Sequence, residues 1–160
     1  MRTRFAVSAA TLTVLALASA VTPLVGQKKG AATAVGGDII SQMSASDVTS
    51  LLRDMGYDPQ GLEGRDNAWT IELSGRRAVV MLSSSGQNLA LWSYVTGSKV
   101  TLEKINEWNK TKRFSRAYLD SDGDPNVEWD IDLEGGVSLG AVREGIRTFG
   151  LVIDAFKDFF

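Results

Sequence analysis

The sequence contains no cysteine and no histidine among its 160 residues. The absence of cysteine excludes disulfide bonds and every thiolate mechanism, so that packing alone must hold the fold together. The absence of both residue types also removes the usual ligands of zinc and the nucleophile–histidine pairs of hydrolases. Any catalytic chemistry would therefore depend on carboxylate, lysine, tyrosine or main-chain groups.

The first twenty residues have the three-part order of a secretory signal peptide. Arg2 and Arg4 precede an apolar run from Phe5 to Ala18, and small residues follow up to Ala20. The run is shorter than the roughly 20 residues of a membrane-spanning helix, which favours cleavage after Ala20 over retention as an uncleaved anchor. We therefore expect a periplasmic or secreted protein with no membrane span after cleavage.

The charge balance argues against nucleic acid as a partner. Without the two arginines of residues 1–20, the chain carries 15 basic and 19 acidic side chains, a net charge of −4. Binding to phosphates requires a basic patch, and the longest basic cluster is only Lys110–Arg116. We therefore expect no nucleic-acid partner.

The chain divides into a leader and one domain. Gln27–Asp38 is small, polar and rich in glycine, which is typical of a flexible linker. Residues 21–38 are therefore predicted to be a flexible leader, and residues 39–160 are predicted to form the domain.

The first half of this domain has a helix pattern followed by strand patterns. Ser44 and Asp47 have the spacing of a capping box, and apolar residues recur at helical intervals from there to Gly56. Alternation over Trp69–Leu73 predicts a first strand. Two nearly continuous apolar runs predict two further antiparallel strands that are covered on both faces: Arg77–Ser83 and Asn88–Val95.

The second half repeats this order with fewer strands. Thr101 can cap a helix that ends near Lys112, and two strands should follow it. From Ser138 to Phe160, apolar residues step by three and four, which predicts one long amphipathic helix. The predicted fold is α+β, with an antiparallel sheet of about five strands and the order αβββαββα.

An acidic stretch connects the last two predicted strands. Tyr118–Gly136 contains seven carboxylates in nineteen residues, and Asp122-Gly123 is a strong signal for a two-residue hairpin turn. Such a turn would place Arg116 opposite Trp129, where the two could form a cation–π pair. It would also pair Phe114 with Ile131 and Tyr118 with Val127.

Several of these segments resemble the YbjN-domain family. The resemblance rests on "INEWN" at 105–109, on "RFSRAYLDSDGDP" at 113–125, on "DLEGGV" at 132–137, and more weakly on "SASDVTSLLRDMGYD" at 44–58. The family is described as sensory transduction regulators of bacteria. Its fold is similar to that of type III secretion chaperones, which dimerise. The resemblance implies no catalytic residues, but the signal peptide departs from the cytoplasmic members of the family.

The acidic stretch permits two further interpretations. Asp120, Asp122 and Asp124 have the spacing of the first ligands of an EF-hand calcium loop, but Pro125 and Ile131 replace its required glycine and glutamate. Two suitably placed carboxylates would also suffice for acid–base hydrolysis of a sugar. The hairpin remains the favoured interpretation, with weak cation binding and catalysis as alternatives.

Aromatic and apolar residues suggest two candidate surfaces. Trp108, Arg116 and Trp129 could line a ligand groove, although core packing of the tryptophans is the simpler interpretation. The terminal helix carries a stripe that could be core or a partner or dimer surface, namely Phe149, Ile153, Phe156 and Phe160. Gly145 and Gly150 within it would permit close approach of a neighbouring subunit.

The sequence therefore favours a non-enzymatic protein- or peptide-binding module of YbjN type, chaperone-like or regulatory, without a cofactor. We expect a homodimer with a further, unidentified protein or peptide partner. The alternative from another class is a carboxylate-based, cation-dependent hydrolase, or a calcium-binding protein, that uses Asp120–Asp132.

Export can be tested directly. Because the first twenty residues have the order of a cleavable signal, mass spectrometry of the protein from its native host should find Val21 as the N-terminal residue. Recovery of a cytosolic form that retains Met1 would remove the argument for a periplasmic or secreted location.

Overall fold

The structure is a computed structural model that describes residues 38–160. The predicted signal peptide (1–20) and all but the last residue of the predicted leader (21–38) lie outside the described residues. Within residues 38–160, none of the helices combines the length and the apolar character that crossing a lipid bilayer requires. In chain order the elements are β1 (Ile39–Ile40), α1 (Ala45–Asp54), β2 (Gln60–Gly61), β3 (Ala68–Leu73), β4 (Arg76–Leu82), β5 (Asn88–Tyr94), α2 (Leu102–Thr111), β6 (Arg116–Leu119), β7 (Pro125–Asp132), β8 (Val137–Ser138) and α3 (Leu139–Phe159).

The predicted α+β architecture and its element order are confirmed. The main sheet has six strands in the order β2-β3-β4-β5-β7-β6, and each neighbouring strand pair in it is antiparallel. The five predicted strands correspond to β3, β4, β5, β6 and β7. The two-residue strand β2 extends the sheet, and β1 pairs with β8 in a separate small sheet.

The three helices begin where polar side chains cap them. The Ser44 side chain accepts a hydrogen bond from the backbone N–H of Asp47, and the Asp47 carboxylate accepts one from the backbone N–H of Ser44, which completes the predicted capping box. Thr101 caps α2 by accepting from the backbone N–H of Lys104, and Ser138 caps α3 by accepting from that of Ala141. Each cap supplies a partner to a backbone N–H that the first turn of a helix leaves unpaired.

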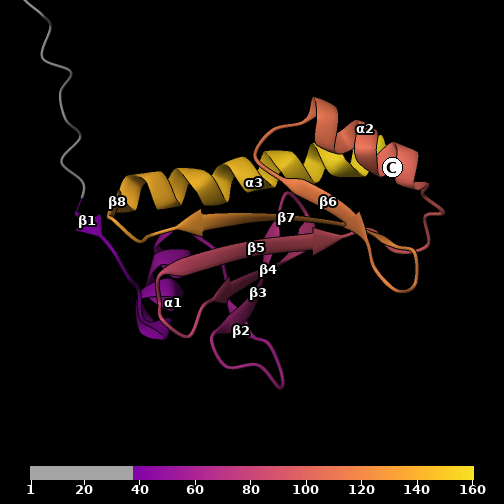
Figure 1. Cartoon of the computed structure of the whole chain (residues 1–160). Helices are drawn as coiled ribbons and strands as arrows, with labels where there is room; N and C mark the ends of the chain where they lie inside the picture. The colour runs from indigo at the N-terminus through magenta and orange to yellow at the C-terminus, as the bar shows by residue number, and fades with distance from the viewer. Residues whose placement is uncertain (1–37) are drawn as a thin grey trace, which may run out of the picture. The chain divides into compact units, whose positions relative to one another are not determined.

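The helices cover only one face of the sheet. The cross-strand row Trp69, Val80, Leu91 and Trp129 faces them, and it shares one core cluster with the buried residues of α1, α2 and α3. Figure 1 shows α2 and α3 lying together over this face. Ala68 and Val79 point the other way and lie outside this cluster, although both are buried. The prediction of cover on both faces is therefore confirmed for the middle of β4 and wrong for β5, where buried residues alternate with partly exposed ones.

The register of the β6–β7 hairpin also differs from the prediction. Arg116 lies opposite Glu128, and Tyr118 lies opposite Asn126, because the connecting loop is the five residues 120–124. Successive side chains of a strand alternate between faces, so this shift of one residue turns Arg116 away from Trp129. Gly123, which the sequence analysis placed in the turn, has a positive φ of 83°.

The outer edge of β6 is closed by a side chain of α2. The amide of Asn109 donates to the carbonyl oxygen of Ala117 at 3.0 Å and accepts from its N–H at 2.8 Å. The indole of Trp108 donates to Ser115 Oγ at 3.1 Å. Two neighbouring residues of the "INEWN" segment thus bind α2 to β6 and to the residue before it. The hydrogen bonds of Asn109 replace those that a further strand would make at this edge.

The glycines of α3 serve packing within the subunit. A Cβ on Gly145 would lie 2.8 Å from Ile131 Cδ1, and a Cβ on Gly150 would lie 3.3 Å from Ser74 Oγ. Ser74 Oγ also donates to the Gly150 carbonyl oxygen at 3.2 Å. Both glycines therefore bring α3 close to its own sheet and its own β3–β4 turn, which corrects the suggestion that they face another subunit.

The closure by Asn109 predicts a specific loss of stability. Asn109→Ala removes two hydrogen bonds to the buried Ala117 and should lower the free energy of unfolding by about 2 kcal/mol. Urea denaturation measures this value. Lys110→Ala is the matched control, because Lys110 lies in the same helix turn and its side chain makes none of the described hydrogen bonds. Equal stability of the two variants would show that the amide does not secure this edge.

Candidate functional site

The face of the sheet opposite the helices is the main candidate site. Its central cross-strand row is Thr70, Val79, Trp92, Glu128 and Arg116. Flanking rows add small, apolar and aromatic side chains, namely Ala68, Met81, Ala90, Tyr94 and Tyr118. We refer to this surface as the uncovered face, since the buried residues of α1, α2 and α3 join the core on the other side of the sheet. A sheet face of this composition would more often lie against another layer of structure.

A shallow hollow lies on the uncovered face. Its volume is about 390 Å³, and it opens between the loop that follows β2 and the strands. Val79, Met81 and Trp92 contribute its apolar surface, while Arg65 and Glu128 contribute charges of opposite sign. Leu62 and Tyr118 complete the lining. The hollow could receive an apolar side chain of a partner, but it is too open to enclose a small ligand as deep pockets do.

The aromatic side chains on this face are held in place. The rings of Trp92 and Tyr94 stack with centroids 5.1 Å apart and planes 24° apart. The Trp92 indole N–H donates to Asn126 Oδ1 at 2.9 Å, so its polar end is bonded inside the subunit. A partner would therefore meet a pre-ordered aromatic surface, which reduces the loss of side-chain entropy on binding.

Charged groups border the aromatic centre on the β6–β7 side. Arg116 pairs with Glu128 through its Nε and with Asp130 at 3.8 Å. The Tyr118 hydroxyl donates to Glu128 Oε2 at 3.4 Å. Partial burial, followed by the charge of Glu128, raises the pKa of Tyr118, while the hydrogen bond to Glu128 raises the pKa of Arg116. Glu128 is therefore engaged with both Arg116 and Tyr118, which suits a structural role.

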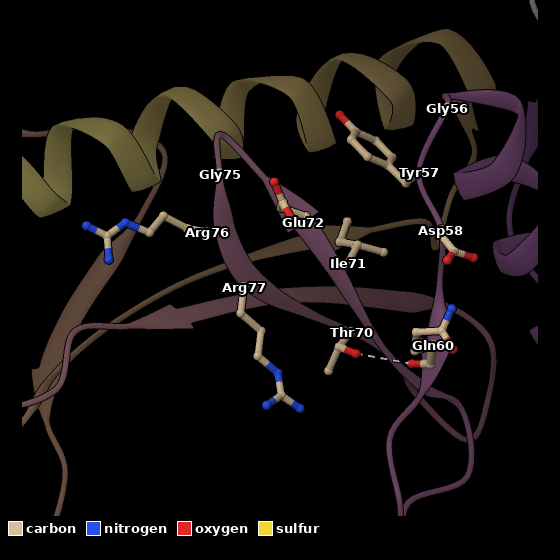
Figure 2. Close-up of a pocket in the computed structure, with 10 residues that line it drawn as sticks. All are labelled: Gly56, Tyr57, Asp58, Gln60, Thr70, Ile71, Glu72, Gly75, Arg76 and Arg77. Atoms are coloured by element: carbon tan, nitrogen blue, oxygen red, sulfur yellow. Dashed lines mark hydrogen bonds between the residues drawn. The ribbon is translucent and has the colours of Figure 1, made fainter.

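A larger cavity of about 680 Å³ lies at the free edge of β3. Tyr57, Glu72, Arg76 and Arg77 are among its lining residues. Figure 2 shows the guanidinium groups of Arg76 and Arg77 extending in different directions, with the Tyr57 ring lying apart from both. The charged groups do not converge on a common point, so this cavity lacks the arrangement of a binding site for one small ligand.

The structure separates the three residues of the predicted ligand groove. Trp108 is buried with a relative exposure of 1%, in edge contact with Phe156 and Phe159. Trp129 lies on the helix-covered side of the sheet, where the exposed Phe114 ring packs against it at 5.5 Å. Arg116 lies on the uncovered face. The groove is therefore not formed, because the one-residue shift of the hairpin puts Arg116 and Trp129 on opposite faces.

Most of the predicted partner surface on α3 belongs to the core. Phe149, Ile153 and Phe156 have relative exposures of 0%, 3% and 1%, and Phe160 is partly buried beside Phe156. The stripe packs on its own sheet and on α2, so it presents no exposed surface to a partner. Whether the protein dimerises is a separate matter, and any dimer must use another face.

The acidic loop after β6 uses its carboxylates for its own turn. Asp120 Oδ1 accepts from the backbone N–H groups of Asp122 and Asp124, and its Oδ2 accepts from the Asn126 amide. The Asn126 hydrogen bond and those from the backbone lower the pKa of Asp120. Asp124 Oδ1 accepts from Gly97 N. Within residues 38–160, no group of three acidic residues is arranged to hold a metal ion.

From the sequence, the uncovered face was not identified as a site because β5 was predicted to be covered on both sides. The alternation of residue types along β5 could have indicated a partly exposed face. Along β5, Leu89 and Leu91 alternate with Ala90, Trp92 and Tyr94, and the latter set contains the types that tolerate a partly exposed position.

Comparison with known proteins identifies relatives of the whole domain. The family model of YbjN, described as "Putative bacterial sensory transduction regulator", matches residues 44–160. The solved structure of YbjN from E. coli, described as "a putative transcription regulator", is similar with a TM-score of 0.54 and 16% identity. That likeness covers 75% of this chain and 96% of the other. No curated protein matches the chain.

A chaperone–effector structure is also similar to the chain. It is the HopA1–SchA complex, with a TM-score of 0.47, 12% identity, and coverage of 64% of this chain and 82% of the other.

The turn around Asp120 predicts a pH-dependent stability. Asp120→Ala should lower the melting temperature at pH 7, because three donors lose their acceptor. A carboxylate whose pKa is lowered on folding stabilises the fold fully at pH values above its pKa in the unfolded chain, about 3.9. The stabilisation is lost as the pH falls through its pKa in the folded state. The difference in melting temperature between Asp120→Ala and the wild type should therefore vanish in acid. Asp122→Ala, whose carboxylate accepts none of the described hydrogen bonds, is the control.

The same measurements test the calcium alternative. Millimolar calcium should leave the melting temperature of the wild type unchanged. A clear rise that the double change Asp122→Ala and Asp124→Ala abolishes would show that the loop binds the cation.

Proposed function

Because the chain belongs to the YbjN family, we propose that it is a non-enzymatic protein-binding module with a regulatory role, which acts in the periplasm or outside the cell after export. Family membership supports a binding or regulatory role in general terms. The location is supported by the order of residues 1–20 alone. The further parts of the proposal depend on the geometry of the domain.

The composition of the uncovered face supports protein binding. It combines an aromatic and aliphatic centre of Met81, Trp92 and Tyr94 with charges at its border, which is the composition typical of protein interfaces. Tyrosine and tryptophan are also the residues that most often dominate binding energy at such surfaces. A sheet face with partly exposed tryptophan and methionine side chains would gain free energy when a protein surface removes it from water.

Binding through the edges of the sheet has less support. At one edge, Asn109 of α2 already occupies the backbone groups of Ala117 in β6. At the other edge, β2 pairs with Trp69 and Thr70 of β3, so that only a short part of β3 lacks a neighbouring strand on this side. A partner strand would therefore find few backbone groups to pair with, which favours binding through the face.

The arrangement of carboxylates supports the non-enzymatic part of the proposal. Glu128 and Asp130 both pair with Arg116, so these carboxylates already have a partner within the fold. The hydrolase and calcium-binding alternatives gain no support from the geometry of Asp120–Asp132. A homodimer and a further protein or peptide partner both remain part of the proposal.

Site-specific photo-crosslinking in the native host tests protein binding through this face. A benzophenone amino acid in place of Tyr94, which is 38% exposed on the uncovered face, should form protein adducts. The matched control places it at Leu151, 69% exposed on the side of α3 that faces away from the sheet, where few adducts should form. Mass spectrometry identifies the adducts. Adducts from Leu151 alone, or equal adducts from both positions, would contradict the proposed surface.

A further inference from the structure

Negative charge is in surplus along one border of the uncovered face. Glu128, Asp130 and Asp132 alternate along β7, so all three side chains lie on this face. Arg116 is the one cation paired with them, and among residues 38–160 no salt bridge within 4 Å involves Asp132. Along this border, three carboxylates are therefore balanced by a single guanidinium group.

The cations on the other half of the face are already offset by neighbouring carboxylates. Arg77 on β4 lies directly opposite Glu72 on β3. Arg65 lies in the loop after β2, between Glu63 and Asp66 along the chain. Neither arginine adds a positive region that would balance β7, so a partner surface that complements this face must bring positive charge to it.

Apolar side chains remain accessible beside these carboxylates. Val79 is already buried within the subunit, so it offers no surface to a partner. Met81, Ala90 and Trp92 are each partly exposed, and Met81 and Trp92 line the hollow. Met81, Ala90 and Asp130 form one cross-strand row. Because neighbouring strands lie about 4.8 Å apart, Met81 and Asp130 are separated by about 10 Å across β5.

We infer that the uncovered face binds a basic amphipathic helix of a partner protein. The inference rests on the proposed protein-binding role of this face and names the chemistry of its occupant. A segment that lies over the middle of a sheet reaches no free strand edge, so it must satisfy its own backbone hydrogen bonds, as a helix does. A helix with its side chains is about 10 to 12 Å across, which matches the distance from Met81 to Asp130.

The spacing of side chains on such a helix fits the face. A leucine or another large apolar side chain would enter the hollow beside Met81 and Trp92. A lysine or arginine three or four positions away lies about 5 to 6 Å from it on the same side of the helix. Its long side chain would reach Asp130 and Asp132. The small side chain of Ala90 leaves room for the helix between these two contacts.

Titration with designed peptides tests this inference. The probe is a fluorescein-labelled helical peptide of about 18 residues, with leucine along one face and lysine beside it. Its counterpart carries glutamate at every lysine position. Fluorescence anisotropy with the purified exported chain should show binding of the lysine peptide and at least about tenfold weaker binding of the glutamate peptide, because the β7 carboxylates attract one and repel the other. Added salt should weaken binding of the lysine peptide.

Substitutions in the chain locate the binding site. Asp130→Asn with Asp132→Asn keeps the shape of two exposed side chains, so the fold should be preserved, and should weaken binding of the lysine peptide about tenfold. Met81→Gln should weaken it about fivefold, because it removes apolar surface from the hollow. The matched control is Asp154→Asn with Asp158→Asn, which removes two exposed carboxylates from α3 and should leave the affinity unchanged. Circular dichroism checks that each variant is folded.

Two results would overturn the inference. One is a lysine peptide that fails to bind at about 100 micromolar, or that binds no more tightly than the glutamate peptide. The other is binding that survives the changes at Met81 or at the two β7 aspartates, or that depends equally on the aspartates of α3.

Photo-crosslinking at Tyr94 separates failure of this inference from failure of the proposed function. Adducts that map to basic helices of a partner support the inference. Adducts that map only to other surfaces, a second copy of this chain included, leave protein binding by the face intact and overturn its occupant. If no adduct forms at Tyr94, the proposed binding surface fails as well.

Discussion

Packing of all three helices on one side of a single sheet is the constraint on which the rest of this structure depends. A chain without disulfide bonds must obtain its stability from one continuous core, and here that core lies between the helices and the row of Trp69, Val80 and Leu91. Gly145 and Gly150 let α3 approach the sheet closely enough for Phe149 and Phe156 to be fully buried. Because no helix remains for the opposite side, Trp92 and Tyr94 stay partly exposed.

The segments that mark the family are mainly structural. Trp108 fills the space between α2 and the end of α3, and its neighbour Asn109 closes the outer edge of β6. Asp120 and Asn126 hold the loop that sets the register of β7. These residues determine which side chains of β6 and β7 reach the uncovered face, although none of them forms a binding surface itself.

The charged residues of β6 and β7 form ion pairs beside the aromatic residues of the uncovered face. Arg116 pairs with both Glu128 and Asp130 across neighbouring strands, an arrangement that keeps three charges beside an aromatic surface without isolating any of them. Exposed ion pairs of this kind contribute little to stability, and their larger effect is on the choice and orientation of partners. In a family described as regulatory, such a surface is the part of the domain where specificity can reside.

The sequence by itself determined the α+β class, the order of the elements, the capping residues Ser44 and Thr101, and the family, because each depends on local periodicity or on short motifs. Only the tertiary structure decided which face of each strand is covered. An apolar strand has the same pattern whether its second face meets a helix or a partner, and the number of helices available to cover it is a property of the whole fold. The register of Arg116 likewise depended on the length of a loop whose turn is set by Asp120, a contact that spacing alone does not predict. The observed register differs from the predicted one by one residue. Because neighbouring side chains of a strand point to opposite sides, this difference decided which groups lie on the uncovered face.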